Sequence, residues 1–422
     1  MVVARPDHGT FAKVVSKLLS VTLALLVCGC TSGWAPLSID EVPFRDRAET
    51  QDMGGVRVTA SVPSARESHE IFADDLYKRG VQPVWLEIEN RQDEAIVFLS
   101  VGLDANYFTP HETASLFEKK KFRRKKEVYF FSNGVESTIQ PGETRSGFVF
   151  SHLDEGTKAF NVDIAGEFES WHLTIFIQVP GLKVDHYDVD FRKLYSLDQV
   201  ESVDESSLVT VIEALPCCTR DKKGESEGDP LNLVVVGAPM DVYYAFIRAG
   251  WDETEVVAAS SGFKTAISFI TGGEYRYSPV SSLYVFIRPQ DVAFQRIRTH
   301  IHERNHLRLW MSRWLYEGNP VWIGQISRDI GVRFTTKTIT THKIDPNVDE
   351  TREFLVENLA YNQVLARLGY ADGAVAASIQ APRRNLTGDR YFTDGRRVVL
   401  WVTKDQVELD DIEIVEWKTP LD

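Results

Sequence analysis

The chain has 422 residues, of which 43% are hydrophobic and 26% are charged, a balance typical of a folded protein with room for two domains. Its formal net charge is −14, because 61 Asp and Glu residues outnumber 47 Lys and Arg residues. This acidity makes nucleic acid a poor partner, since proteins that bind it present basic surfaces.

The first 29 residues have the pattern of a cleaved export signal. Arg5, Lys13 and Lys17 supply a positive start, and an apolar run from 18 to 27 follows. The run is shorter than the roughly 20 residues that span a bilayer. We therefore expect a signal peptide at 1–29 and no transmembrane helix there.

The signal ends in Leu26-Val27-Cys28-Gly29-Cys30, which resembles the lipobox of bacterial lipoproteins. The resemblance implies that Cys30 becomes the mature N-terminus and carries a lipid anchor, since two acyl chains bind a membrane stably. The residues after Cys30 are Thr31 and Ser32. The position directly after the cysteine is thus not Asp, and for a lipoprotein this implies the periplasmic face of the outer membrane within the cell envelope. An uncleaved anchor or ordinary secretion is the alternative.

Short alternating segments follow the anchor. Residues 30–55 are polar, contain proline and glycine, and are predicted to form the lipid anchor and a flexible tether. From 56 to 212 the apolar residues recur with period two between turn residues, as at 84–89. We expect an immunoglobulin-like β-sandwich domain over 56–212, with one short helix at 110–118.

The segment 119–126, Lys-Lys-Lys-Phe-Arg-Arg-Lys-Lys, is strongly basic within an acidic chain. On a lipid-anchored protein it would contact anionic headgroups, with Phe122 entering the interface. The alternative is a solvated loop between strands, which the flanking Glu118 and Glu127 favour.

The pattern changes in the second half of the chain. Residues 213–229 are charged and are predicted to be a linker, and 406–422 a tail. Between them, 230–405 mixes the two periodicities without strict alternation, which predicts a mixed α+β domain. The expected strands are 231–236, 282–287, 306–311, 320–327 and 398–402, and the expected helices are 241–249 and 345–368.

Two adjacent cysteines, Cys217 and Cys218, stay in the chain once Cys28 has left with the signal and Cys30 carries lipid. Adjacent cysteines close only a strained ring. A labile disulfide, a redox-sensitive site and two unpaired thiols are the open alternatives, and we favour a structural or incidental role.

Motifs within 230–373 resemble the LssY C-terminal domain family of bacterial envelope proteins. They are Pro230-Leu-Asn-Leu-Val-Val-Val-Gly237, Ser278-Pro-Val-Ser281, Arg288-Pro-Gln-Asp-Val-Ala-Phe-Gln295, Arg304-Asn-His-Leu-Arg-Leu-Trp310, Gly324-Gln-Ile-Ser-Arg-Asp329 and Thr341-His-Lys-Ile-Asp-Pro-Asn-Val-Asp-Glu-Thr-Arg352. In this family the domain occurs beside membrane domains of lipid metabolism, so the resemblance implies lipid or lipid-phosphate metabolism at the envelope. It supplies no catalytic residues.

Arg304, His306, Arg308 and Trp310 alternate along a predicted strand, so their side chains share one face. Together with Arg288 they form a candidate anion-binding site, because guanidinium groups present donors that match phosphate oxygens. The alternative is the ordinary solvent face of a strand.

A second set of residues suggests metal or catalytic chemistry. His300, His302 and His342 are candidate ligands for Zn²⁺ or Mn²⁺. His306, His342 and Asp345 are candidate catalytic residues, with histidine as a general acid. The alternative for Asp345 is to cap the following helix.

The sequence thus predicts a membrane-anchored envelope lipoprotein that is a non-catalytic module recognising a phosphorylated envelope lipid or a protein partner. The alternative is a metal-assisted hydrolase of a phosphate-containing envelope substrate, for which a divalent metal would be the cofactor. Neither a serine-hydrolase elbow nor a nucleotide-binding loop occurs, and the sequence leaves open whether the chain is an enzyme.

Overall fold

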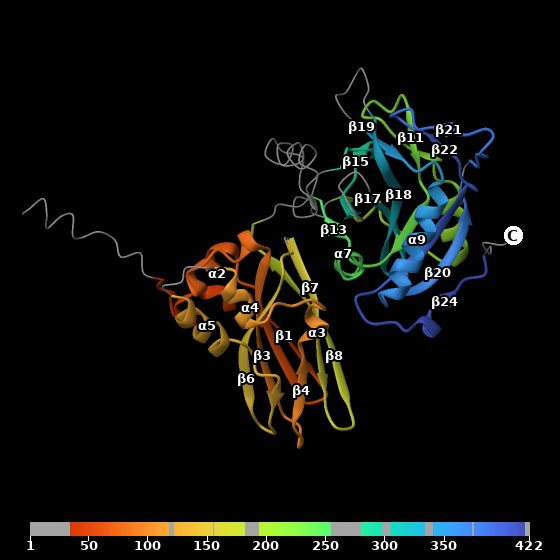
Figure 1. Ribbon diagram of the computed structural model, residues 1–422. Coiled ribbons are helices and arrows are strands. Elements are labelled where there is room, and N and C mark those ends of the chain that lie inside the picture. Colours follow the sequence, from red (N-terminus) through yellow and green to blue (C-terminus); the bar gives the residue numbers. More distant parts are fainter. Residues whose placement is uncertain are drawn as a thin grey trace, which may run out of the picture.

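The computed structural model describes residues 34–117, 122–154, 156–181, 194–254, 280–297, 304–333, 341–373 and 375–417. Within these ranges the chain forms two domains, coloured red to yellow and green to blue in Figure 1. Both domains combine helices with strands, in agreement with the predicted mixed class.

The described part of the first domain contains two four-stranded antiparallel sheets, with the strand orders β1-β2-β3-β6 and β5-β4-β7-β8. The strands are β1 (Glu49–Met53), β2 (Val56–Ser61), β3 (Val81–Asn90), β4 (Ile96–Leu99), β5 (Thr138–Ile139), β6 (Thr144–His152), β7 (Gly156–Ala165) and β8 (Ser170–Val179). Buried side chains from both sheets, among them Val58, Leu86, Val162 and Ile175, form one core. The two sheets therefore face each other as a sandwich.

Helices gather at one end of this sandwich, where α2, α4 and α5 lie (Figure 1). The helical segments are η1 (Ile39–Glu41), η2 (Pro43–Arg47), α2 (Ala65–Phe72), η3 (Tyr77–Arg79), α3 (Ser100–Leu103), α4 (Pro110–Ser115) and α5 (Arg123–Ser132). The short helix expected at 110–118 is confirmed as α4. The basic run, for which a loop was the favoured alternative, instead enters α5 at Arg123.

The expected tether is folded from residue 34 onward, so its predicted extent of 30–55 is wrong. Val42 and Phe44 are buried in a cluster with Phe72 and Phe148. Burying each such side chain stabilises the folded state by about 1.5–3 kcal/mol, which offsets the loss of conformational entropy when the segment becomes ordered. Of the residues that suggested a linker, Pro43 begins the helical turn η2, and Gly54 and Gly55 form the β1–β2 turn.

The second domain is built around a ten-stranded sheet in the described residues, with the central order β16-β17-β18-β12-β23-β20. Its strands are β9 (Glu201–Val203), β12 (Leu233–Val236), β13 (Asp252–Glu253), β16 (Val292–Ile297), β17 (Arg304–Tyr316), β18 (Asn319–Arg333), β19 (Thr341–Ile344), β20 (Leu365–Asp372), β23 (Arg396–Val402) and β24 (Glu413–Ile414). Smaller sheets contain β10 (Cys218–Arg220), β11 (Glu227–Pro230), β14 (Tyr284–Val285), β15 (Arg288–Pro289), β21 (Arg383–Arg384) and β22 (Arg390–Tyr391).

Helices cover both faces of the large sheet. On one face, Phe246 of α7 (Pro239–Arg248) and Leu355 of α9 (Val348–Tyr361) pack against Leu307 and Leu309. On the other face, α6 (Glu205–Glu213) packs near Trp310. Strand β12 is buried on both faces, which explains its unbroken apolar sequence. A last helical turn, η6, spans Leu409–Asp411.

Three expected boundaries differ from the structure. The linker expected at 213–229 contains strands β10 and β11, which form a hairpin of the second domain. Residues 205–212, which were assigned to the sandwich domain, instead belong to helix α6, and Leu208 of this helix is buried in the second domain's core. The tail expected at 406–422 contains β24, which pairs with β20, and buries Val415. In each of these segments a few apolar residues among polar ones pack against the second domain.

Strands β17 and β18 form the longest hairpin of the sheet. They pair from Asn305 opposite Arg328 to Tyr316 opposite Asn319. The two turn residues, Glu317 and Gly318, both have positive φ angles, 49° and 80°, as hairpins with two-residue turns require.

The helix expected at 345–368 is confirmed as α9 but ends earlier, at Tyr361. Gln363 has a φ of 59°, which is incompatible with continuing the helix. Val364 and Leu365 have apolar spacing that fits the helix, yet they enter the core from β20 and the turn before it.

The two domains meet where β7 and β8 approach α7 and β13. Thr157 donates its backbone N–H to Glu253 Oε2 at 2.8 Å, and its hydroxyl lies 2.7 Å from the Tyr243 hydroxyl. Phe176 stacks on Tyr244 with ring centroids 4.2 Å apart. Burial raises the pKa of Glu253 to about 7, against the lowering effect of the bonds from Thr157.

This contact predicts a dependence of stability on pH. A carboxyl whose pKa is higher in the folded protein binds its proton more tightly there, so its stabilising effect is complete below the unfolded pKa of about 4.5 and is lost as pH rises towards 7. We expect the free energy of unfolding to fall by roughly 3 kcal/mol across that window on account of this group. Urea titrations of the wild type and of Glu253→Gln would measure it. An equal slope in the two proteins would contradict the prediction.

Candidate functional site

Strand β17 directs Arg304, His306 and Arg308 to one face of the large sheet, opposite to Leu307 and Leu309. The structure brings the three polar side chains together. They lie inside the protein, with exposed fractions of 5%, 6% and 4%. Any role in binding must therefore be judged from the partners that already surround them.

Asp329 of the neighbouring strand β18 joins Arg304 to His306. Its Oδ2 accepts a hydrogen bond from Arg304 Nε at 3.2 Å, and its Oδ1 lies 3.1 Å from His306 Nε2. Arg304 also donates from Nη1 to Gln295 Oε1 at 2.5 Å. Asp329 is fully buried, so its charge depends on these donors for compensation.

The hydrogen bonds fix the tautomer of His306. Its Nδ1 lies 3.2 Å from Arg308 Nη1, and a guanidinium nitrogen only donates. Nδ1 therefore accepts, and the ring proton is on Nε2, where it is donated to Asp329. Burial lowers the pKa of His306 although Asp329 opposes the shift, so the ring is neutral and both nitrogens are engaged within the protein.

Arg308 is held at both ends of its guanidinium group. Nη1 donates to Gln325 Oε1 at 2.7 Å, and Nε donates to the carbonyl oxygen of Ser281 at 2.9 Å. Burial lowers the pKa of Arg308 to about 10, and the charges of Asp229 and Asp329 oppose that shift. Arg308 is therefore still charged at neutral pH.

Asp229 of β11 adds a second buried carboxyl group. Its Oδ1 accepts from Asn385 Nδ2 at 2.9 Å. Burial raises its pKa, while the bond from Asn385 and the positive charge of Arg308 lower it. The group of Arg304, His306, Arg308, Asp329 and Asp229, here called the buried polar cluster, thus combines both signs of charge with its own hydrogen-bond partners.

Two other residues of the expected anion site lie apart from the buried polar cluster. Trp310 is fully buried in the apolar core near α6, and its Nε1 donates to the carbonyl oxygen of Arg288 at 3.3 Å. The Arg288 guanidinium pairs with Asp291, with Nε to Oδ1 at 3.0 Å and Nη2 to Oδ2 at 2.8 Å. Both residues shape the loop before β16, and their expected role in anion binding stays a prediction.

The expected catalytic set is not seen to converge. Asp345 Oδ1 accepts from the backbone N–H of Asn347 at 3.0 Å, which forms a local turn just before α9. The N-cap residue of α9 is Asn347, and no side-chain hydrogen bond caps the helix there, so Asp345 does not fill the capping role that was its alternative. His342 pairs through its backbone with Val332 in the β18–β19 ladder. The side chain of His342, and the whole of His300 and His302, lie outside the described residues, so the metal site expected there stays a prediction.

Sequence reasoning missed Asp229 as a member of the buried polar cluster and Gln295 as a hydrogen-bond partner of Arg304. The signal for Gln295 is local, because Gln295, Gln325, Ser327 and Asp329 are polar residues at alternate positions of otherwise apolar strands. Asp229 has no such signal. It precedes an apolar strand in a segment that reads as a linker, and only the fold places it near Arg308.

Comparison with known proteins supports the assignment made from the motifs. Residues 210–396 match the family model described as LssY C-terminus. No curated protein matches the chain significantly. The match includes the buried polar cluster from Asp229 to Asp329, together with α7 and α9. The second domain of this chain is therefore an LssY C-terminal-like domain.

Proposed function

We propose that the protein is a cell-envelope lipoprotein, anchored through Cys30 to the periplasmic face of the outer membrane, that recognises phosphorylated lipid with its first domain. In this proposal the LssY C-terminal-like domain is a non-catalytic module. An immunoglobulin-like relationship of the sandwich is part of the same proposal. Among the described residues, no helix is both long and apolar enough to cross a membrane.

The observation that carries the proposal is the position of Trp34 against α5. Its ring meets Tyr129 edge-on with centroids 5.3 Å apart, and its Nε1 donates to the carbonyl oxygen of Phe72 at 2.7 Å. Only residues 31–33 separate Trp34 from Cys30, a reach of at most about 14 Å. An acyl chain on Cys30 would therefore hold α5 at the bilayer surface.

The outer face of α5 suits an anionic lipid surface. Arg124, Val128 and Phe131 follow helical spacing, with Val128 58% and Phe131 76% exposed, and Lys125 lies beside them. Arg124 and Lys125 have no ion-pair partner among the described residues. Positive side chains at the N-terminus of a helix are unfavourable. An external anion that binds Arg124 and Lys125 would explain why they stand in the first turn of α5. Lys119, Lys120 and Lys121 lie outside the described residues.

The inner face of α5 explains why the helix is held firmly. Lys126 is buried and donates from Nζ to both carboxylate oxygens of Asp74 at 2.6 Å. Phe130 packs in the aromatic cluster with Phe72 and Phe150. The outer face of α5 is therefore held in a fixed position by the packing of its inner face.

The buried polar cluster supports a module over an enzyme. Both nitrogens of His306 are engaged by Asp329 and Arg308, so the ring has no free nitrogen with which to protonate a leaving group. The metal-assisted hydrolase is the second candidate. Turnover of a lipid phosphomonoester that His342→Ala abolishes in a folded protein would favour it instead.

Vesicle binding tests the lipid-recognition role. We expect a soluble Cys30→Ser form to bind vesicles containing phosphatidylglycerol better than pure phosphatidylcholine vesicles. Replacing Arg124 and Lys125 by Gln removes two charges near the surface, each contributing about 1 kcal/mol, and should weaken binding roughly 30-fold. Co-sedimentation at low and high salt measures the effect.

The matched control is the Lys222→Gln, Lys223→Gln variant, which removes the same charge from an exposed turn of the second domain. It should bind like the parent protein. Equal loss in both variants, or equal binding to neutral vesicles, would contradict lipid recognition by α5. Lipidation is tested separately by measuring the mass of the N-terminal peptide of the protein that retains Cys30. Acylation should raise this mass, and an unshifted mass would show that Cys30 carries no lipid.

A further inference from the structure

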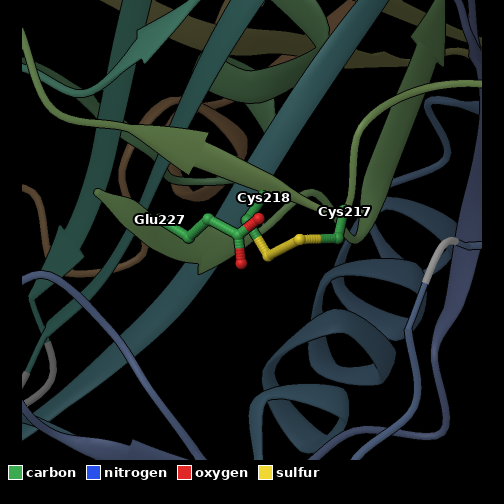
Figure 2. Close-up of side chains that lie close together, drawn as sticks. All are labelled: Cys217, Cys218 and Glu227. Carbon is green, nitrogen blue, oxygen red and sulfur yellow. A yellow bond between two sulfur atoms is a disulfide. The ribbon is translucent and has the colours of Figure 1, made fainter. Parts of the chain in front are cut away.

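Cys217 and Cys218 are joined to each other by a disulfide at the start of β10 (Figure 2). Cys218 is buried and Cys217 is partly exposed. Glu227, on the paired strand β11, brings its carboxylate close. One oxygen of this carboxylate and the two Sγ atoms all lie within 4.8 Å of one another, the one such grouping of three metal-binding side chains among the described residues.

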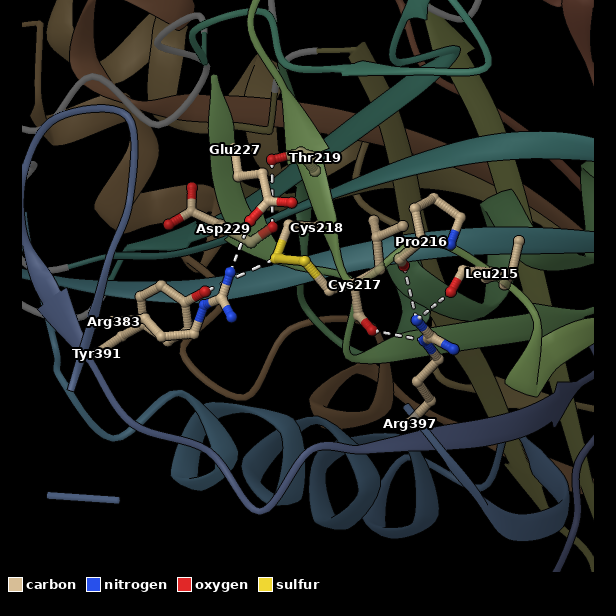
Figure 3. Close-up of a disulfide and its surroundings, with 11 residues drawn as sticks. Leu215, Pro216, Cys217, Cys218, Thr219, Glu227, Asp229, Arg383, Tyr391 and Arg397 are labelled. Carbon is tan, nitrogen blue, oxygen red and sulfur yellow. Dashed lines mark hydrogen bonds and ion pairs between the residues drawn. A yellow bond between two sulfur atoms is a disulfide. The ribbon is translucent and has the colours of Figure 1, made fainter. Parts of the chain in front are cut away.

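The backbone on both sides of the pair is held in place. Leu231 donates its N–H to the carbonyl oxygen of Cys217 at 2.8 Å, which continues the β10–β11 hairpin. On the other side, Arg397 donates to the carbonyl oxygens of Leu215 and Pro216 at 3.2 and 2.7 Å (Figure 3). The backbone that carries the two cysteines is therefore held by hydrogen bonds that do not involve the disulfide.

Two polar side chains lie beside the disulfide and Glu227. Arg383 donates to Glu227 Oε2 at 2.6 Å, which places a positive charge beside the pair, and the Tyr391 hydroxyl lies 3.7 Å from Cys218 Sγ.

We propose that reduction of the Cys217–Cys218 disulfide creates a site for a soft divalent cation such as Zn²⁺, bound by the two thiolates and the Glu227 carboxylate. Two thiolates and one carboxylate are donors that Zn²⁺ accepts, and a fourth position is left for water. Arg383 then acts on the outer side, fixing the carboxylate orientation through Oε2.

A dithiol supplies the two electrons for reduction. One of its thiolates attacks the partly exposed Cys217 Sγ, the S–S bond breaks, and Cys218 leaves as a thiolate beside Tyr391. The second thiolate of the reductant attacks the resulting mixed disulfide, which frees Cys217 and oxidises the reductant to its own disulfide. The two protons of the reductant pass to the two cysteines and are released to solvent when Zn²⁺ binds.

Metal titration of the full chain tests the proposal. Cys28 and Cys30 are replaced by Ser so that Cys217 and Cys218 are the only cysteines. The protein is reduced with a phosphine, freed of it without oxygen, and titrated with Zn²⁺ against a chromogenic chelator. We expect one Zn²⁺ per reduced chain, none per oxidised chain, and a thiolate charge-transfer absorption when Cd²⁺ replaces Zn²⁺.

Three variants identify the ligands. Cys217→Ser should lower the Zn²⁺ affinity by about 100-fold or more, and Glu227→Gln and Arg383→Gln by about tenfold each, within the range known for groups around a metal. Glu225→Gln, which removes an exposed carboxylate from the same hairpin, is the control and should change nothing. Equal Zn²⁺ binding before and after reduction, no binding to the reduced chain, or equal effects of Glu227→Gln and Glu225→Gln would overturn the proposal.

Discussion

Replacing Asp329 by Ala is expected to lower the free energy of unfolding of the second domain by about 3–5 kcal/mol. The change leaves Arg304 as a buried cation without its carboxylate and removes the acceptor for His306 Nε2. Urea denaturation followed by tryptophan fluorescence would measure the loss, because Trp310 and Trp322 are buried in this domain.

Asp405→Ala is the control for that experiment. Asp405 pairs with Lys404 on the surface, where both side chains are largely exposed. Such pairs contribute little, so the control should change stability by less than about 0.5 kcal/mol. A loss below about 1 kcal/mol for Asp329→Ala would show that the buried polar cluster does not depend on this carboxylate.

Arg397→Met is expected to destabilise the second domain by about 3 kcal/mol or more. The fully buried Arg397 side chain donates to four backbone carbonyls, those of Leu231, Ile212, Leu215 and Pro216. Methionine fills similar volume without donors, and each carbonyl left unsatisfied costs about 1–3 kcal/mol, reduced where the loop relaxes. Urea titration by circular dichroism is the measurement.

Two further variants show whether the geometry of the guanidinium group matters. Lysine at 397 keeps the charge but lacks the planar arrangement of donors, so Arg397→Lys should recover only part of the loss. Arg384→Met removes an exposed guanidinium that donates to the Gly388 carbonyl, and it should be close to neutral. Full stability of Arg397→Lys would mean that charge alone supports the segment before Cys217.

Much of the second domain was predictable because its signals are local. The apolar run of β12 predicts a strand buried on both faces, and the alternation along β17 predicts that Arg304, His306 and Arg308 share a side of the sheet. The end of α9 was not predictable from apolar spacing, because Val364 and Leu365 continue a helical pattern. Their position is set by the turn at Gln363 and by packing in the core.

Contacts between distant segments were beyond local reasoning. Val42 and Phe44 are isolated apolar residues in a polar segment, and their burial depends on α2 and β6. The pairing of Arg308 with Gln325 could be anticipated from neighbouring strands. The approach of Asp229 could not, since it depends on how the β10–β11 hairpin lies over the sheet.

The turn at Glu317 and Gly318 has a consequence for the order of folding. Strands β17 and β18 are adjacent in sequence, so closing their hairpin costs little chain entropy and takes place within microseconds. Strand β12 must instead pair with β18 on one side and with β23 on the other, from Leu233 opposite Val398 to Val236 opposite Trp401. A chain that emerges from its N-terminus therefore holds β12 unpaired on one edge until residue 402 has been released, and for that interval this apolar edge is open to aggregation.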